Sequence, residues 1–546
     1  MNYGFIIDNR KCIGCHACTV ACKSEHDVPV GVNRTWVKQT EKGVFPDTRR
    51  IFSVLRCNHC EDAPCVTICP VEALYTREDG IVDFNNDRCI GCKSCMQACP
   101  YDALYIDPNT QTAAKCNYCS PRIDVGLEPA CVNVCPEHAI ISGDMDNPNT
   151  EIAQLLSREQ VSVRKPEKST KPNVYYIDGD LASLNPTTTE RSDRYFWNSQ
   201  SSGVGHYARF VETLAKKHDP KNPSGEVQFN SIKSTTVTYA GNTGQSCSNE
   251  TEKNGLNEND ARRIYDTPDK GILWGWEVAG YVMTKAISAG ALLVLFLAFI
   301  FNFSDVSITN LWLSIGAGLF FLAATGILLV MDLDQPKRFV YVLLRPQWKS
   351  WLVRGGYSIT VYGGLLTLLG VFTLLEMDLV VTILLWASAL IAVLVAVYTA
   401  FLFAQAKGRD FWQSPTLALH MLIHSFMAGA AFFTISNVVF ESTPDWGQFL
   451  SYVLYISIGL NLFIMLIELT MTHPTEDSKR VAHMIVSGRY KNKFWFGSIL
   501  IGNVLPLVLI FIGGGWITAL AGLLVIIGIY LTESIWIEAP QRIQLT

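Results

Sequence analysis

Sixteen cysteines lie within the first 135 residues, and their spacing divides them into four groups of four. The first and third groups share the spacing C-x2-C-x2-C-x3-C, and the second reads C-x2-C-x4-C-x3-C. In the fourth group the middle gap widens to eleven residues. Such a run can wrap a cubane iron–sulfur cluster with three thiolates, while the fourth cysteine binds the other cluster of a pair. The groups are Cys12, Cys15, Cys18 and Cys22; Cys57, Cys60, Cys65 and Cys69; Cys89, Cys92, Cys95 and Cys99; and Cys116, Cys119, Cys131 and Cys135.

Zinc sites and plain structural thiols are the alternative interpretations of these cysteines. Zinc sites use C-x2-C pairs separated by a longer span, often with histidine, and do not explain four quartets that each end in C-x3-C. Pro70, Pro100 and Pro136 follow the last cysteine of three groups and match the C-x3-C-P pattern of iron–sulfur proteins. Sixteen cysteine ligands, at four ligands per cluster, predict four 4Fe-4S clusters. Cys247 stands alone in a polar stretch, and we interpret it as a thiol without a cluster.

Short helices and hairpins are expected to position these ligands. The segments EALYTREDGIVDFNNDRC and DALYIDPNTQTAAKC alternate apolar runs with turns, which is typical of small hairpins. The first group would combine with the fourth, and the second with the third, as two double-cluster modules. The sequence therefore predicts an α+β ferredoxin-like domain that carries four clusters over residues 1–160.

Residues 1–160 resemble the four-cluster ferredoxin-like subunit of molybdopterin oxidoreductases, which accompanies dimethyl sulfoxide, polysulfide and nitrate reductases and formate dehydrogenases. All four cysteine motifs match. The resemblance implies that the first cluster lies nearest a catalytic molybdopterin-type partner and the last nearest the membrane. Some relatives lack the second cysteine of the third group and hold three irons, but Cys92 is present here. The ligand sets that it implies are Cys12, Cys15, Cys18 with Cys135; Cys116, Cys119, Cys131 with Cys22; Cys57, Cys60, Cys65 with Cys99; and Cys89, Cys92, Cys95 with Cys69.

Residues 161–270 form a polar connector that is rich in Ser, Thr, Asn, Lys, Pro and Gly and is too polar to bury a core of its own. The segment TKPNVYYIDGD is a candidate strand or a contact with the cluster domain. A flexible tether and an arm that grips a partner subunit are the two roles considered. Exposed aromatic side chains are costly, which favours partner contact, and the aromatics concerned are Tyr175, Tyr176, Tyr195, Phe196 and Trp197.

The remaining residues, 271–546, predict an all-α transmembrane bundle of about eight helices. Each apolar stretch is long enough to cross a bilayer, which takes roughly 20 residues. The formal net charge of the whole chain is only −5, so nothing in the composition suggests a nucleic-acid partner. The expected spans are 272–301, 311–332, 355–375, 379–404, 415–440, 448–471, 494–511 and 516–534.

The charges in the loops indicate an orientation in the membrane. Basic residues cluster in the loops on the side of the cysteine-rich domain, among them Lys337, Arg338, Lys407 and Arg409. The opposite loops, NFSDVSITN, EMD, ESTPDWG and GGG, contain no Lys or Arg. By the positive-inside rule, the cluster domain is expected in the cytoplasm and the chain in the inner cell membrane. The opening MNYGFIIDNRKC lacks an export signal, which agrees, although a basic face could instead dock the cluster domain.

This half resembles the eight-helix anchor family typified by the membrane subunit of polysulfide reductase. The resemblance rests on WGWEVAGYVMTKAISAGA, MDLDQPKRF and YTAFLFAQAKGRDFWQSP, and it covers the whole membrane half. It implies a quinone site near the cluster side and no haem. The quinone would be menaquinone or ubiquinone, and Tyr398 matches the family's Tyr-Thr-x-x-Leu position.

Ionisable side chains inside a membrane are expensive and usually functional, and here they gather in the half of the bundle nearer the cluster domain. Glu277, Tyr281 and Lys285 are four residues apart and share one helix face. Histidine and glutamate are natural proton carriers for quinone chemistry. The candidate quinone and proton residues are Tyr398, His420, His424, Glu468, Glu277, Tyr281, Lys285 and Asp332.

Structural roles for these side chains compete with the functional ones. Glu277 and Lys285 could form an ion pair that holds helices together. His420 and His424 could ligate a haem or metal, or they could be packing partners. Glu468 could reach the membrane interface.

Together the motifs predict an electron-transfer and membrane-anchor subunit of a respiratory oxidoreductase. Electrons would pass through four clusters between a separate catalytic subunit and the membrane quinone pool. A second hypothesis is an ion-translocating module that uses the buried ionisable residues, and a third is an assembly subunit that binds no quinone. The terminal substrate and the direction of electron flow are not readable from the sequence.

Overall fold

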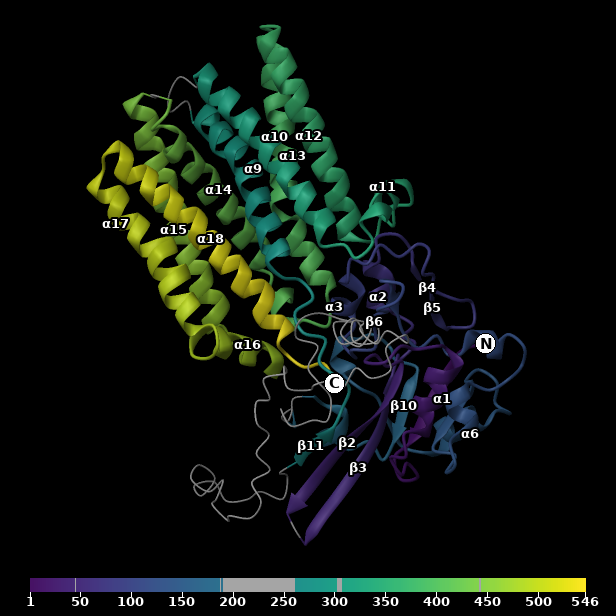
Figure 1. Ribbon diagram of the computed structural model, residues 1–546. Helices are drawn as coiled ribbons and strands as arrows, with labels where there is room; N and C mark the ends of the chain where they lie inside the picture. The colour runs from purple at the N-terminus through teal and green to yellow at the C-terminus, as the bar shows by residue number, and fades with distance from the viewer. Residues whose placement is uncertain (45, 187, 190–260, 302–306, 441–442) are drawn as a thin grey trace, which may run out of the picture.

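A computed structural model of the chain describes residues 1–44, 46–186, 188–189, 261–301, 307–440 and 443–546. It has an α+β part built from the cysteine-rich residues and a bundle of long helices (Figure 1). The C-terminus lies at the junction of the two parts. The fold class predicted from the sequence is confirmed.

A mixed four-stranded sheet forms one side of the cysteine-rich part. Its central strand β1 carries three consecutive buried residues, Phe5, Ile6 and Ile7, because both faces of the sheet are covered. Phe5 and Ile7 pack toward the cysteines, whereas Ile6 packs under helix α6 (Glu151–Arg158), as the two-residue period of a strand requires. The strand order is β8 (Ile140–Asp144), β1 (Tyr3–Asp8), β10 (Val174–Ile177) and β9 (Val161–Ser162).

A long hairpin extends away from the body of this part (Figure 1). It is formed by β2 (Thr35–Val44) and β3 (Asp47–Arg56), and β11 (Ala261–Tyr265) pairs with β2. The two small hairpins predicted beside the cysteines are confirmed, since β4 (Leu74–Thr76) pairs with β5 (Val82–Phe84) and β6 (Tyr105–Ile106) pairs with β7 (Ala113–Ala114).

Short helices carry the later cysteines of each group. The residue before three of these helices has a left-handed backbone, namely His16, Lys93 and Cys119, so the chain turns sharply between the first cysteines and the helix. Pro64 occupies the first turn of α2, where its missing N–H costs nothing. The helices are α1 (Ala17–Glu25), α2 (Pro64–Ile68), α3 (Ser94–Ala98), α4 (Ser120–Ile123) and α5 (Ala130–Asn133).

Both ends of the polar connector pack on the cysteine-rich part. The strand proposed for TKPNVYYIDGD is confirmed as β10, where Tyr176 is buried and its hydroxyl donates to the Val54 carbonyl at 3.1 Å. Helix α7 (Leu181–Leu184) follows, and β11 closes the connector at its other end. Tyr195, Phe196, Trp197 and Cys247 lie outside the described residues, so partner contact by that segment stays a prediction.

Eight helices of the described residues are long and apolar enough to cross a membrane, as predicted. The last one differs most from expectation, because it continues seven residues beyond the predicted end at 534. The spanning elements are α9 (Trp276–Ile300), α10 (Ile308–Met331), α12 (Trp351–Leu374), α13 (Asp378–Gln405), α14 (Leu417–Ser436), α15 (Pro444–Thr470), the π-helical η5 (Lys493–Val504) continued by α17 (Leu505–Ile512), and α18 (Gly515–Gln541). Short α11 (Tyr341–Leu344) and α16 (Glu476–Val486) lie between spans.

Helix α9 is the centre of the bundle and the most buried of the eight spans. It lies between a group formed by α10, α12 and α13 and a group formed by α14, α15, α17 and α18, and α13 also packs on α14 (Figure 1). Gly290 of α9 and Gly429 of α14 meet backbone to backbone, and a Cβ on either would collide with the other helix. Close approach of this kind through small residues is how membrane helices pack tightly.

Buried polar contacts join the two parts at the junction. Gln541, at the end of α18, accepts from Gln97 at 2.6 Å and from the backbone N–H groups of Leu273 and Trp274 at 2.9 and 3.0 Å. Arg409 donates to Gln97 at 2.9 Å. These contacts fix the third cysteine group against the cluster-side end of the bundle.

Candidate functional site

Three hollows in the cysteine-rich part are each lined by four cysteines. One hollow is lined by Cys12, Cys15, Cys18 and Cys135, another by Cys57, Cys60, Cys65 and Cys99, and another by Cys69, Cys89, Cys92 and Cys95. Among the described residues, no three Cys, His, Asp or Glu side chains converge on a point that suits a single ion. Each quartet therefore surrounds a space rather than one metal position.

The remaining cysteines form a fourth quartet. Cys22 lies in electrostatic range of Cys116, Cys119 and Cys131. Every quartet thus combines three cysteines of one sequence group with one cysteine of another, in the same sets that the family resemblance implies.

Adjacent quartets approach one another in a single order. Cys18 of the first set interacts electrostatically with Cys131, and Cys116 of that second set interacts with Cys57. Cys65 of the third set interacts with Cys95 of the last. At the outer end Cys15 is exposed, whereas the last set touches the helix bundle.

The quartets fit an anionic iron–sulfur cluster in their electrostatics. Burial raises the pKa of the Cys18 thiol to about 12, so a thiolate there needs positive charge beside it. Iron supplies that charge when bound, because a coordinating thiol is deprotonated outright.

A buried arginine with unused donors points to the same conclusion. Arg56 is fully buried, donates Nη1 to Cys131 Sγ at 3.1 Å and lies over the Phe5 ring at 4.4 Å. Its Nε and Nη2 atoms have no partner within the described protein atoms. Burial opposes its charge, but the thiols of Cys131, Cys116 and Cys18 outweigh burial and raise the pKa of Arg56. The orphaned donors suit the sulfur of a negatively charged group between the first two quartets.

Lys115 occupies the equivalent place between the next two quartets of the row. Its ammonium group is buried and is held by the Val82 and Cys116 carbonyls. It lies in electrostatic range of Cys57, Cys65 and Cys116, between the second and third quartets. A buried cation therefore stands at each of these two junctions.

Arg56→Gln is expected to lower the reduction potential of an adjacent cluster by on the order of 100 mV, because one positive charge is lost several ångströms from it in a buried site. Redox titration followed by EPR measures the shift. Arg56→Lys keeps the charge and serves as the control, so it should shift the potential far less. Equal shifts in both variants would show that packing rather than charge sets the potential.

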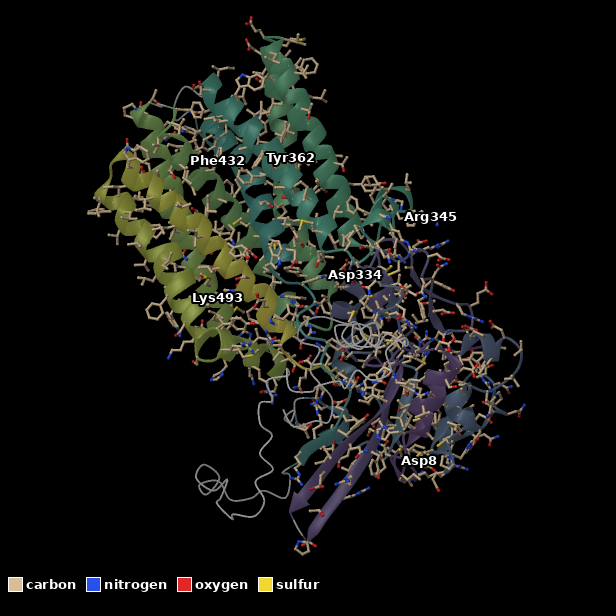
Figure 2. The ribbon with its side chains drawn as sticks, viewed as in Figure 1. Asp8, Asp334, Arg345, Tyr362, Phe432 and Lys493 are labelled. Atoms are coloured by element: carbon tan, nitrogen blue, oxygen red, sulfur yellow. The ribbon has the colours of Figure 1, made fainter. Side chains whose placement is uncertain are left out.

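The last quartet is enclosed partly by residues of the membrane half. Lys93, next to Cys92, donates to the Asp332 carbonyl at 2.9 Å and lies 3.3 Å from an Asp334 carboxylate oxygen. Figure 2 places Asp334 at the junction, far from Tyr362 and Phe432 inside the bundle.

Two further side chains of the membrane half reach the loops that hold this quartet. Arg338 donates to the Cys89 carbonyl at 3.0 Å, and the Trp274 indole donates to the Cys92 carbonyl at 3.2 Å. The quartet of Cys69, Cys89, Cys92 and Cys95 is thus in direct contact with the helix bundle.

One group of predicted membrane residues gathers around Lys285. Its ammonium donates to the Ala396 carbonyl at 3.1 Å and to Thr399 Oγ1 at 2.6 Å, and lies 4.6 Å from the Tyr398 ring centre. Tyr398 and Tyr281 are buried and are electrostatic neighbours. The Tyr398 ring fits only because Gly355 has no side chain, since a Cβ there would overlap it. Glu277 and Asp332 interact electrostatically at the cluster-side end of the same helices.

The expected alternative of a Glu277–Lys285 ion pair is wrong. Eight residues on one helix separate the two side chains by about 12 Å along the axis. Lys285 instead uses its donors to hold α13.

A second group forms a buried hydrogen-bonded chain across α14, α15 and α18. His420 Nδ1 lies 3.0 Å from a Glu468 oxygen, and the two Nε2 atoms of His420 and His424 are 3.1 Å apart. His424 Nδ1 lies 2.7 Å from an oxygen of Glu533. Trp536 donates to Glu468 at 2.9 Å. All four members of the chain have side chains no more than 5% exposed.

All four imidazole nitrogens therefore have hydrogen-bonding partners among the described residues. Glu468 is buried beside His420 and also lines a cavity on the cluster side of the bundle.

Sequence reasoning missed Glu533 and Trp536. Glu533 seemed to stand at the end of a span predicted to stop at 534, but α18 runs to Gln541 and places it about two turns inside the helix. The rule that buried charge marks function would have found it, had the helix end been placed correctly. Glu533 also links the two groups, because it interacts electrostatically with Lys285.

Known families and proteins match both parts of the chain. The 4Fe-4S dicluster domain matches residues 11–74 and 48–145, and the polysulphide reductase, NrfD, family matches residues 267–533. A tetrathionate reductase subunit of Salmonella typhimurium is 45% identical over 188 residues, which are 34% of this chain and 75% of that protein. A polysulfide reductase chain of Wolinella succinogenes is 44% identical over 180 residues, 32% of this chain and 93% of that one.

A third relative, the arsenate respiratory reductase iron-sulfur subunit ArrB of Shewanella sp. (strain ANA-3), is 34% identical over 225 residues, 32% of this chain and 96% of that protein.

These proteins are subunits of reductase complexes, so the chain is an oxidoreductase subunit that carries 4Fe-4S clusters and transfers electrons. The eight apolar helices and the NrfD match make it a multi-pass membrane protein. The chain therefore belongs to the 4Fe-4S dicluster iron–sulfur subunits of reductases, fused to an NrfD-type polysulphide reductase membrane domain.

Proposed function

We propose that this chain passes electrons through four 4Fe-4S clusters between a molybdopterin-dependent catalytic subunit and the membrane quinone pool. The sixteen cysteines of the four quartets bind the clusters. Three of these sets line the hollows described above, and Cys22 with Cys116, Cys119 and Cys131 forms the fourth. The observation that carries the proposal is the single order of these quartets. It runs from exposed Cys15 to the Cys69 quartet, which the membrane helices enclose.

The catalytic partner docks at the outer end of this row and performs the terminal substrate chemistry. Support comes from the reductase complexes to which the relatives belong. The cluster side faces the cytoplasm in this proposal, which the basic loops support by the positive-inside rule, although Arg338 and Arg409 also hold the two parts together.

The quinone, menaquinone or ubiquinone, reacts beside Tyr398, Tyr281 and Lys285. These residues lie on the helices nearest the last quartet, and Leu402 of the same helix as Tyr398 packs with its cysteines. A tyrosine hydroxyl and an ammonium group suit the two oxygens of a quinone, while the cluster beyond them receives or supplies electrons.

Metal analysis of the anaerobically purified chain tests the cluster count. About sixteen irons per chain are expected from four cubane clusters, together with EPR signals of interacting 4Fe-4S centres after reduction. A content of about eight irons, or of zinc in their place, would contradict the proposal.

Tyr398→Phe should slow quinol oxidation by about tenfold or more, because a hydrogen bond to the quinone is lost. Stopped-flow kinetics with a menaquinol analogue measure the rate, and EPR should show unchanged clusters. Tyr452→Phe, on the exposed face of α15, is the matched control. Normal quinol kinetics in the Tyr398 variant would place the quinone elsewhere.

Proton movement is a second candidate function, supported by the buried chain from Glu468 to Glu533. Reconstitution of the complex with a pH-sensitive dye inside liposomes tests whether electron flow moves protons across the membrane. An acid or alkaline shift that collapses with an uncoupler supports translocation.

A further inference from the structure

A cavity of about 610 Å³ lies on the cluster side of the helix bundle, where the loop after α13 meets the end of α15 and residues 167–169. Buried Glu468 and Trp536 form part of its wall, beside apolar Phe411. The ion pair of Lys168 and Asp410 stands at its edge. Its size and mixed lining leave room for water against the Glu468 carboxylate.

The cavity is the outer end of the chain Glu468–His420–His424–Glu533. Each link is a contact of 3.1 Å or less, and the chain leads from the cavity wall toward Lys285. Two buried carboxylates and two buried imidazoles inside a membrane are costly, and the cost is offset only if they neutralise one another.

Counting hydrogens shows that this chain holds one mobile proton. With both carboxylates ionised, each Nδ1 donates to its carboxylate, and the facing Nε2 atoms of His420 and His424 share a single hydrogen. Three hydrogens on two imidazoles give one positive charge against two carboxylates. The Lys285 ammonium restores neutrality. When the His420 Nδ1 proton passes to Glu468, two hydrogens stay on the pair, and rotation of both imidazole rings then turns a free nitrogen of His424 toward Glu533, which restores the third hydrogen.

We infer that the cavity is the opening to water of a proton relay that serves the quinone, and that the relay consists of Lys285, Glu533, His424, His420 and Glu468. This inference rests on the proposed quinone site beside Tyr398. When a quinol is oxidised, its two O–H bonds break, two electrons pass to the clusters and two protons leave. Lys285, which is in electrostatic range of Glu533 but donates to Ala396 and Thr399, passes a proton to Glu533 through an intervening water and is reprotonated by the quinol, while Glu468 releases one to the cavity. Quinone reduction runs the same steps in reverse.

The relay requires that protons exchange with the solution on the side of the clusters. The complete complex in liposomes tests this with a menaquinol analogue as donor and ferricyanide, which does not cross the bilayer, as external acceptor. Only molecules whose clusters face outward then turn over, so an external pH dye should acidify at one proton per ferricyanide reduced. Acidification of the interior instead would overturn the relay.

Glu533→Gln should slow quinol turnover by about tenfold or more, while dithionite still reduces the clusters to the same EPR intensity. The matched control is Glu538→Gln, on the same helix, whose carboxylate accepts from Tyr490 outside the relay. If Glu533→Gln protein lacks clusters, Glu468→Gln replaces it. Wild-type turnover in both relay variants overturns the inference and leaves the quinone proposal intact. A wild-type complex that cannot oxidise quinol overturns both.

Discussion

Replacing Cys69 with alanine is expected to remove the cluster of the third cysteine group and to spare that of its own group. Cys69 belongs to the second group in sequence, yet its side chain lines the hollow of Cys89, Cys92 and Cys95. The variant should lose about four of about sixteen irons and all electron transfer to quinone, because the break falls at the membrane end of the row. Iron analysis and quinol kinetics measure the two losses.

Three variants distinguish crossed ligation, in which a cluster takes its fourth cysteine from another sequence group, from sequential ligation, in which each group holds its own cluster. The EPR spectrum of reduced Cys69→Ala protein should coincide with that of Cys89→Ala and differ from that of Cys65→Ala. The matched control is Cys247→Ala, because that cysteine belongs to no quartet and its loss should change nothing. Coincidence of the Cys69 and Cys65 spectra would mean that each group holds its own cluster.

Gly290→Ala should disrupt the helix bundle, although it adds a single methyl group. The new Cβ would collide with the Ser425 carbonyl of α14, a backbone atom that cannot move without moving the helix. Overpacking typically costs about 1–3 kcal/mol, and two helices held backbone to backbone lie at the upper end of that range. Thermal unfolding of the purified protein in detergent should show a lowered midpoint.

Loss of quinol activity should accompany the loss of stability in this variant. Helix α9 carries Lys285 and α14 carries both relay histidines, so separating the helices also separates their side chains. Gly459→Ala is the matched control, since nothing lies within 4 Å of its added Cβ. Equal midpoints for the two variants would contradict tight packing between α9 and α14.

The sequence predicted the parts of this molecule that depend on local spacing. The cysteine quartets, the small hairpins and the eight spans each follow from short-range patterns, and the structure has the same elements at nearly the same positions. The pairing of cysteines from distant groups came from family resemblance, because spacing alone does not tell which group crosses to which.

Tertiary contacts account for what was missed. The end of the chain reads TESIWIEAPQ, which looks like a polar exit from the membrane, yet Glu533, Trp536 and Gln541 are buried. They are buried because the histidines of α14 and the cluster domain pack against them. Arg409 was similarly read as a marker of membrane orientation, whereas its guanidinium holds Gln97 and the carbonyls of Pro540 and Ile543. Such partners lie far away in sequence and leave no local signal.

The amide of Gln541 joins three segments that separate polypeptides would have to bring together by diffusion. Because cluster carrier and anchor share one chain, their effective concentration is fixed by the connector and does not fall on dilution. Covalent linkage therefore adds to a contact that combines these hydrogen bonds with an apolar cluster, in which Val342, Val353 and Leu402 pack against the cysteine-rich part. Extraction into detergent should therefore keep the last cluster next to its membrane acceptor. Because one chain carries both the cluster domain and the membrane domain, their stoichiometry is one to one.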